Sequence, residues 1–365
     1  MKIIKFWETE VGNKDYKYQK KIFSINYPNE GKYVKKLEDK IKKILKIKYC
    51  VALPSGTSAM FVALKILNLK SYDEVIVPNI TFAATANAVN LAGAKVILVD
   101  VNPETLNIDI KDLEKKISNR TKVIMPVHIS GRSCDMTSII KIAKRKKIKI
   151  IEDAAEAFLS MNKNKYLGTI GDMGCFSLSP NKIFTSGQGG LLVTNNKKYF
   201  DKIKVFKTQG RVGVTSGGDD LHISVGGNFK LSNISAGLAL SQLDRLYKRK
   251  NKLTENYKLY KLKLNSKKIK ILKFDIKNNE LPLWTDVICE SRDKLYNYLR
   301  KNNIICRKFW FPLSKKNFYS HQKHSSFKNT NKIEKNIMWL PSSFLMKKQD
   351  QLRVIKKIKI FYKIN

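Results

Sequence analysis

Residues 74–100 read EVIVPNITFAATANAVNLAGAKVILVD and contain a complete strand–helix–strand unit. Residues 74–78 form a short apolar run that ends in proline, and residues 95–100 form a second one that ends in aspartate. Between them, residues 81–91 carry small apolar side chains at helical spacing. Two buried strands joined by a helix are typical of parallel pairing with a crossover. The unit therefore predicts an α/β fold.

The same alternation continues on both sides of this unit. Towards the N-terminus, an apolar run at residues 51–53 leads through a turn of small residues into a helix predicted over 59–67. Towards the C-terminus, strands are predicted at 123–127 and 148–151 around a helix at 136–144. We expect one largely parallel sheet, whose ligands bind beyond the carboxyl ends of its strands.

The regular alternation ends near residue 245, and the chain is predicted to fold as two domains. Residues 1–245 are expected to form the large domain, a mostly parallel mixed sheet sandwiched by helices. Residues 246–365, which are rich in lysine, are expected to form a smaller C-terminal α+β domain. Near the boundary, the glycine-rich residues 208–227 predict a loop, and residues 234–247 predict one long amphipathic helix.

The net charge of +41 comes from 71 Lys and Arg residues against 30 Asp and Glu residues. Such a charge suggests a polyanionic partner. However, only ten of the 71 basic residues are arginine, and the lysines are spread over the whole chain. We therefore interpret the charge as general amino-acid usage, and a nucleic-acid partner is not expected.

The cysteines give no sign of a disulfide framework or a zinc site. They are odd in number and no two have Cys-x-x-Cys spacing; they are Cys50, Cys134, Cys175, Cys289 and Cys306. Free cysteines are typical of a reducing compartment, so a cytoplasmic protein without a bound metal is expected. No apolar run approaches the roughly 20 residues of a membrane-spanning helix.

Lys182 lies in a glycine-dense segment, SLSPNKIFTSGQGG, which covers residues 177–190. Glycines let the backbone approach a ligand closely. Ser177, five residues before the lysine, can offer a hydroxyl to a phosphate. A lysine held in such a pocket can act as a nucleophile through its unprotonated amine. The alternative is an ordinary solvated lysine.

Asp153 ends a predicted strand and is followed by two alanines, which leave room for a flat ring. A carboxylate at a buried strand end needs a cationic partner. The protonated nitrogen of a pyridine ring would be such a partner. Taken alone, an aspartate at this position is more often a helix N-cap, and this alternative stays open.

Two further features suggest a phosphorylated aromatic ligand. Residues 55–58, which include Gly56, Thr57 and Ser58, precede an apolar helix, and a helix start with hydroxyls beside it can bind an anion. An ordinary Ser/Thr cap is the alternative. Phe82 follows a strand and could stack on a ring or belong to the core.

The order of these features resembles that of fold-type I enzymes that use pyridoxal 5′-phosphate (PLP). More narrowly, the chain is similar to the DegT/DnrJ/EryC1/StrS sugar aminotransferase family over nearly its whole length. The motifs that carry this resemblance are Leu53–Ala59, Asp73–Pro78 with Thr81 and Phe82, Gly93–Val96, Pro126–His128, Glu152–Ala157, Phe176–Ser177, Lys182–Gly190, Gly227–Phe229 and Trp310–Leu313.

The resemblance implies a PLP-dependent aminotransferase with assigned site residues. Lys182 would bind the cofactor covalently and then move the proton, and Asp153 would face the ring nitrogen. Glu156 stands where the family usually has glutamine, beside the cofactor hydroxyl, and some perosamine-type members share this glutamate. Phe82 would stack on the ring. The phosphate would be bound by Gly56, Thr57, Ser58 and Ser177.

The resemblance also implies partners and substrates. Asn228 would reach the cofactor phosphate of a neighbouring subunit, which implies a homodimer with shared active sites. The amino donor would be L-glutamate. The acceptor would be a keto-sugar linked to GDP, UDP or dTDP, such as a 4-keto-6-deoxysugar, used for surface polysaccharide such as the O-antigen of lipopolysaccharide. Gln188, Lys230 and Ser314 depart from the commoner family residues, so the sugar itself is not assigned.

Two alternatives stay open at this stage. The enzyme could aminate a ketone that is not a sugar. The chain could also be a nucleic-acid-binding regulator that retains the fold, with its basic charge as the binding surface.

Overall fold

The computed structural model describes residues 2–213, 221–319, 321–322 and 324–364. Within these ranges, seven strands form the central sheet in the order β1-β9-β8-β5-β4-β2-β3. In chain order they are β1 (Tyr49–Leu53), β2 (Glu74–Pro78), β3 (Lys95–Val99), β4 (Thr121–Ile124), β5 (Lys149–Asp153), β8 (Met173–Ser177) and β9 (Gly190–Thr194). Strand β9 pairs antiparallel with β1 and β8, and the other pairs are parallel. The predicted mostly parallel, mixed sheet is confirmed.

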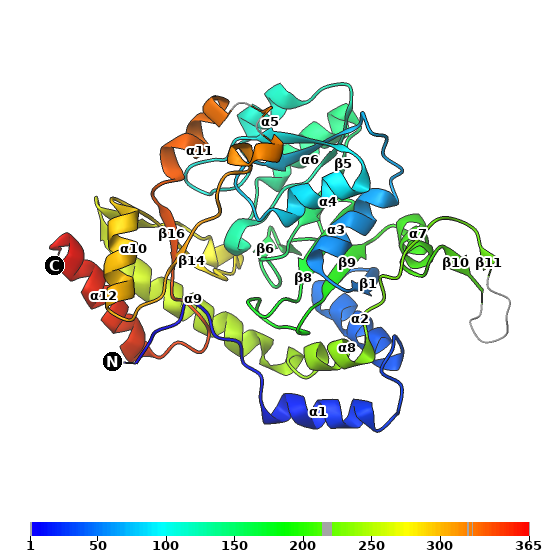
Figure 1. Ribbon diagram of the computed structural model, residues 1–365, viewed down its shortest axis with the longest axis horizontal. Helices are drawn as coiled ribbons and strands as arrows, with labels where there is room; N and C mark the ends of the chain where they lie inside the picture. Colours follow the sequence, from blue (N-terminus) through cyan, green and yellow to red (C-terminus); the bar gives the residue numbers. More distant parts are fainter. Residues whose placement is uncertain (1, 214–220, 320, 323, 365) are drawn as a thin grey trace.

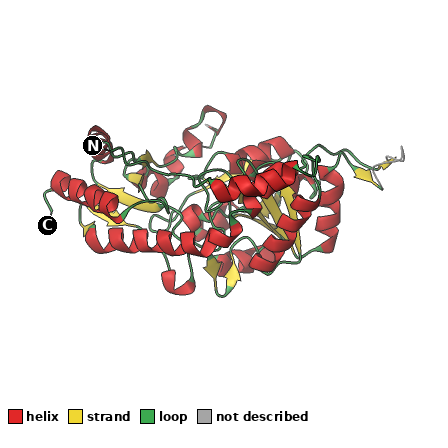
Figure 2. Cartoon of the chain, turned by 90° about the horizontal axis from the view of Figure 1, so that it is seen from below, coloured by secondary structure: helices red, strands yellow, loops and turns green. Residues whose placement is uncertain are grey.

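Helices cover both faces of this sheet (Figure 2). Successive residues of a strand point to opposite faces. Accordingly, Cys50 and Ala52 of β1 lie in one apolar cluster, whereas Val51 and Leu53 lie in another. The helices are α1 (Asn13–Phe23), α2 (Lys32–Leu45), α3 (Gly56–Lys65), α4 (Ala84–Ala92), α5 (Ile110–Lys116), α6 (Met136–Lys146), α7 (Lys197–Lys207), α8 (Asn233–Leu240), α9 (Leu246–Lys263), α10 (Arg292–Lys301), α11 (Lys328–Ile333) and α12 (Lys348–Tyr362).

A second sheet lies in the C-terminal part of the chain. In the described residues its strands are antiparallel and follow the order β12-β13-β14-β16-β15. They are β12 (Asn265–Ser266), β13 (Ile269–Ile271), β14 (Thr285–Cys289), β15 (Arg307–Lys308) and β16 (Ile337–Leu340). The N-terminal segment lies against this part as well, because Ile4 forms a bridge with Ile304 (Figure 1). The division of the chain at residue 245 stays a prediction.

Two predicted segments near the boundary differ in the structure. The helix predicted over 234–247 is interrupted between α8 and α9. At the break, Ser241 Oγ donates to Asp15 Oδ1 of α1, and Arg245 forms an ion pair with the same carboxylate. In the predicted loop over 208–227, β10 (Arg211–Val212) pairs antiparallel with β11 (Leu221–His222). Residues 214–220 of that prediction lie outside the described residues.

All five cysteines lie within the described ranges, and each is a buried free thiol. Burial raises the pKa of the Cys175 thiol and raises that of Cys289 to about 11. In the part of the chain that the structure describes, no helix combines the length and apolar character needed to span a bilayer. The same part contains no cluster of three or more residues that could hold a metal ion.

Candidate active site

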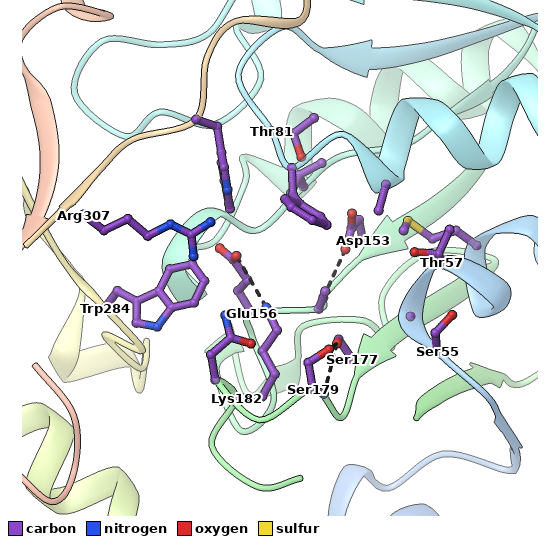
Figure 3. A pocket seen from close by; sticks show the side chains of 18 residues that line it. Ser55, Thr57, Thr81, Asp153, Glu156, Ser177, Ser179, Lys182, Trp284 and Arg307 are labelled. Atoms are coloured by element: carbon purple, nitrogen blue, oxygen red, sulfur yellow. Dashed lines mark hydrogen bonds and ion pairs between the residues drawn. The ribbon is translucent and has the colours of Figure 1, made fainter. Parts of the chain in front are cut away.

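A cavity of about 220 Å³ opens at the carboxyl ends of the central strands (Figure 3). The segments that follow β1 and β2 and the last residues of β5 and β8 line one side of it. Residues of the C-terminal part close the other side. The residues that line it include Gly56, Thr57, Phe82, Asp153, Glu156, Ser177, Lys182, Trp284, Arg307 and Trp310. The cavity lies at the edge of the sheet where parallel strands bind their ligands.

Asp153 places a buried carboxylate at the end of β5, and 4% of the residue is exposed. Its Oδ2 accepts a hydrogen bond of 2.7 Å from Thr85 Oγ1, and its Oδ1 accepts one of 3.1 Å from the backbone N–H of Ala155. Burial raises the pKa of Asp153, although these hydrogen bonds and the charge of Lys182 oppose the shift. The described residues that follow Asp153 begin no helix, so it is not an N-cap. A ligand with a protonated ring nitrogen would supply the cation that this carboxylate lacks.

Lys182 is held inside the cavity and is not a solvated lysine, since 11% of its side chain is exposed. Its Nζ lies 3.6 Å from Glu156 Oε1 and 5.0 Å from the ring centroid of Trp284. The loop that carries it is fastened from the N-terminal segment. The carbonyl of Pro180 accepts hydrogen bonds from Trp7 Nε1 at 3.2 Å and from Thr9 Oγ1 at 2.6 Å. The amine therefore has a fixed place beside Glu156.

Glu156 is the second buried carboxylate of the cavity. Its Oε2 accepts a hydrogen bond of 2.8 Å from the backbone N–H of Ser130. Burial raises the pKa of Glu156 to about 7, and the positive charge of Lys182 and the Ser130 N–H oppose that shift. At neutral pH this carboxyl group is therefore poised between its two protonation states.

The start of helix α3 forms an anion-binding end of the cavity. A Cβ at Gly56 would lie 3.1 Å from Ser177 Cβ, so glycine lets the helix begin close to β8. Ser177 Oγ lies 2.9 Å from Ser179 Oγ. The N–H groups at a helix start, together with these hydroxyls, suit a phosphate. Ser55 is the ordinary cap, because its Oγ accepts the Ser58 N–H.

The structure brings together seven of the nine residues predicted for the site: Gly56, Thr57, Phe82, Asp153, Glu156, Ser177 and Lys182. Phe82 is 55% exposed and lies 6.2 Å from Trp310 between ring centroids, so it is not a core residue. Ser58 is not in the lining, and its Oγ lies 2.9 Å from Ser55 Oγ. Asn228 is exposed and lies outside the cavity. Its contact with a neighbouring subunit stays a prediction.

The site also contains residues that were not predicted from the sequence, among them Thr85, Ser179, Trp284, Arg307 and Trp310. Trp310 lies in one of the quoted family motifs, which is the signal that could have found it. Among the residues that the structure describes, the Arg307 guanidinium has no hydrogen bond or ion pair, and it lies 5.4 Å from the Trp339 ring centroid. Lys182 and Arg307 are the two cationic side chains of the described lining.

These residues fit PLP on three observations: a buried carboxylate that no described cation contacts, a shielded lysine amine, and a helix start with serine hydroxyls beside it. The fold and this site define a PLP-dependent aminotransferase of fold type I. The chain belongs to the DegT/DnrJ/EryC1/StrS aminotransferase family, whose sequence profile matches residues 11–359. The family resemblance, the fold class and the cofactor expected from the sequence are thereby confirmed.

Two curated relatives agree with this assignment, and a solved structure shares the fold. The chain is 33% identical to the GDP-perosamine synthase of Escherichia coli O157:H7, with 99% of each chain covered. It is 31% identical to the GDP-perosamine synthase of Vibrio cholerae, with 80% of each chain covered. The Helicobacter pylori aminotransferase PseC, involved in the biosynthesis of pseudoaminic acid, shares the fold with a TM-score of 0.93 and 23% identity, over 99% of this chain and 100% of that one.

Proposed function

We propose that this enzyme moves an amino group from L-glutamate to a keto-sugar that is linked to a nucleotide, in the synthesis of a surface polysaccharide such as an O-antigen. The observation that carries the proposal is the shielded Lys182 amine in one cavity with the Asp153 carboxylate, which no described cation contacts (Figure 3). The names of the relatives support a sugar acceptor, and two of them are GDP-perosamine synthases.

Four residues of the cavity act on the cofactor ring or on the substrate carbon in this proposal. PLP, when bound, supplies a ring that withdraws electrons from the carbon that loses or gains the amino group. Asp153 holds the proton on the ring nitrogen through its carboxylate. Lys182 binds the cofactor through Nζ and then carries the proton to and from the substrate carbon. Phe82 would cover a face of the ring, and Glu156 would face its hydroxyl group.

The anion-binding end of the cavity orients the cofactor. The N–H groups of Gly56 and Thr57 and the hydroxyl of Ser177 would bind its phosphate, with Ser58 behind them in the first turn of α3. Asn228, which is exposed and outside the cavity, would complete this end in a second subunit of a homodimer. We place this dimer in the cytoplasm, because its thiols are free.

The test of the function is an absorbance spectrum of the protein loaded with PLP, recorded before and after addition of L-glutamate. We expect the visible band of lysine-bound PLP to disappear when the amino group reaches the cofactor, and 2-oxoglutarate to form. Keto-sugars linked to GDP, UDP or dTDP, and ketones that are not sugars, are then offered as acceptors. The return of the visible band identifies the acceptor. A spectrum without a visible band, even with excess PLP, would overturn the proposal.

Arg307 gives a prediction about the substrates, which are anions in either half-reaction. Its guanidinium faces the cavity without a partner among the described residues, so it is free to bind a carboxylate or a diphosphate (Figure 3). We expect Arg307→Ala to raise the KM for the anionic substrate that it binds by roughly 10- to 100-fold, with a much smaller change in kcat. Steady-state kinetics with each substrate varied in turn measure this effect.

The neighbouring Lys308 is a matched control for Arg307. It is also a cation of β15, but it pairs with Asp293 at 2.9 Å and does not line the cavity. Lys308→Ala should leave both KM values unchanged. Equal effects of the two substitutions would show that only the general positive charge of this strand matters.

A further inference from the structure

Ser130 connects the active site to the C-terminal sheet, and every one of its polar groups is used. Its N–H donates to Glu156 Oε2 at 2.8 Å, and its carbonyl accepts the Leu283 N–H at 2.9 Å. Its hydroxyl donates to Asp286 Oδ1 at 2.7 Å and accepts from Trp339 Nε1 at 3.3 Å. Ser130 is completely buried. One residue therefore joins a cavity carboxylate to β14 and β16.

Asp286 is itself held by a buried ion pair. Its Oδ2 lies 2.5 Å from Nη2 of Arg132, and both residues are almost inaccessible to solvent. Arg132 also donates from Nε to the carbonyl of Lys273 at 2.9 Å and from Nη1 to that of Thr105 at 2.7 Å. Its guanidinium carbon lies 4.1 Å from the ring centroid of Phe274. A buried charge pair with its other donors satisfied holds its members in one geometry.

The backbone at Ser130 is in a conformation that the surroundings must maintain. Its φ of 55° lies in the left-handed region, which is uncommon for a residue other than glycine. The next residue, Gly131, has a φ of 96°, and a Cβ there would lie 2.0 Å from the Leu281 carbonyl oxygen. The loop is thus fitted against the C-terminal part of the chain. Contacts with that part keep the Ser130 N–H directed at Glu156.

Among the described residues, the Ser130 N–H is the one hydrogen-bond donor to the Glu156 carboxylate. In the described part of the chain, its carboxylate contacts only the Ser130 N–H and, at 3.6 Å, Lys182 Nζ. The charged groups that act on it are Lys182, which favours its ionised form, and Asp153 and Asp286, which disfavour that form. The Ser130 N–H therefore adds to the stabilisation that Lys182 gives to the negative charge of Glu156.

We infer that Ser130, Asp286 and Arg132, named here the Ser130 bridge, are positioning residues through which the C-terminal sheet holds the Glu156 carboxylate beside Lys182. The inference rests on the proposed function, in which Glu156 faces the hydroxyl group of the cofactor. It adds that Asp286 of the C-terminal sheet, through Ser130, influences the protonation of a group in the cavity without touching the cofactor or the substrate.

The test measures the ionisation of Glu156 in the cofactor-free protein by NMR, with isotope-labelled glutamate carboxyl groups. The Glu156 signal is assigned by its absence in Glu156→Gln. The variant is Ser130→Gly, which removes the hydroxyl anchor and accepts the left-handed backbone. We expect the ionisation midpoint of Glu156 to rise by about one pH unit, a tenfold change in its acid constant, because the released N–H stabilises the charge less.

Ser342→Ala is the matched control for a lost buried hydroxyl. Ser342 is 1% exposed, and its Oγ accepts the Thr285 N–H on β14 without contacting Ser130 or Glu156. Its removal should lower the melting temperature but leave the midpoint of Glu156 in place. Ser130→Ala, which retains an ordinary side chain, should reproduce the shift of Ser130→Gly. An unshifted midpoint in both folded Ser130 variants would overturn the inference.

A second measurement separates this inference from the function. In the PLP-loaded enzyme, the pH profile of kcat/KM should move upward in Ser130→Gly by the same amount as the NMR midpoint. Adding Glu156→Gln to both proteins should remove the difference between Ser130→Gly and the unsubstituted enzyme. The NMR titration needs neither cofactor nor substrate. If the protein binds no PLP, the proposed function fails while the titration still decides the bridge. If aminotransfer is found but the midpoint does not move, only the bridge fails.

Discussion

Replacement of Lys182 by alanine is expected to abolish aminotransfer, with a loss of kcat of about 10⁴-fold, the upper end of what a positioned proton-transfer group contributes. The side chain is the amine of the cavity, and no other lysine of the described chain lines it. The variant should also lose the visible absorbance of lysine-bound PLP. Single-turnover kinetics with L-glutamate and the absorbance spectrum of the loaded protein measure the two effects.

Lys182→Arg is the control that separates the amine from its charge. Arginine keeps a cation near Glu156, whose carboxylate lies 3.6 Å from Nζ, but it does not supply an unprotonated amine. We expect this variant to be as inactive as Lys182→Ala while retaining more of its thermal stability. A Lys182→Ala protein that kept both the visible band and its turnover would contradict the role proposed for this residue.

Asp153→Asn is expected to lower kcat by about 10²- to 10³-fold, the range seen when one preorganised electrostatic partner is removed. Asparagine can still accept the hydrogen bond from Thr85 Oγ1, but it cannot hold a proton on a ring nitrogen. Steady-state kinetics measure the loss. Thr85→Val, which removes the hydrogen bond and leaves the carboxylate, should have a smaller effect on kcat.

The same substitution has an opposite effect on the cofactor-free protein. Burial raises the pKa of Asp153 above its unfolded value, so its contribution to folding is complete at low pH and is lost as the pH rises through the folded-state pKa. Above that pKa the buried charge destabilises the protein, and Asp153→Asn should raise the melting temperature of the apo form. Binding of PLP should then stabilise the unsubstituted protein more than the variant. An equal increase in melting temperature on PLP binding in both proteins would mean that Asp153 does not contact a cation in the complex.

The sequence predicted those parts of the fold that depend on local patterns. The helix predicted at 59–67 begins three residues earlier, at Gly56, because the Ser55 side chain caps it there. The helix predicted at 81–91 begins only at Ala84, because Thr81 and Phe82 belong to the cavity. Such shifts of a few residues come from caps and turns. They leave the order of strands and helices unchanged.

The features that were missed depend on contacts between distant parts of the chain. The break between α8 and α9 is accompanied by contacts of Ser241 and Arg245 with Asp15, more than 200 residues away along the chain. Likewise, Arg307 reaches the cavity from β15 and Trp284 from the position just before β14, and neither residue lies within a motif quoted for the family. Ser314, which departs from the commoner family residue, has a hydrogen-bond partner that the sequence did not indicate, since its Oγ lies 2.6 Å from His324 Nδ1.

The five buried thiols allow the opening rates of different parts of the protein to be measured by chemical labelling. A reagent that alkylates thiolates can reach Cys175 in β8 only when the central sheet opens, and Cys289 in β14 only when the C-terminal sheet opens. Mass spectrometry of each labelled peptide over time gives two separate opening rates in native buffer, without denaturant. If residues 246–365 open as an independent unit, Cys289 and Cys306 become labelled together and at a rate different from that of Cys175. One rate for all three would mean that the chain opens as a single cooperative body.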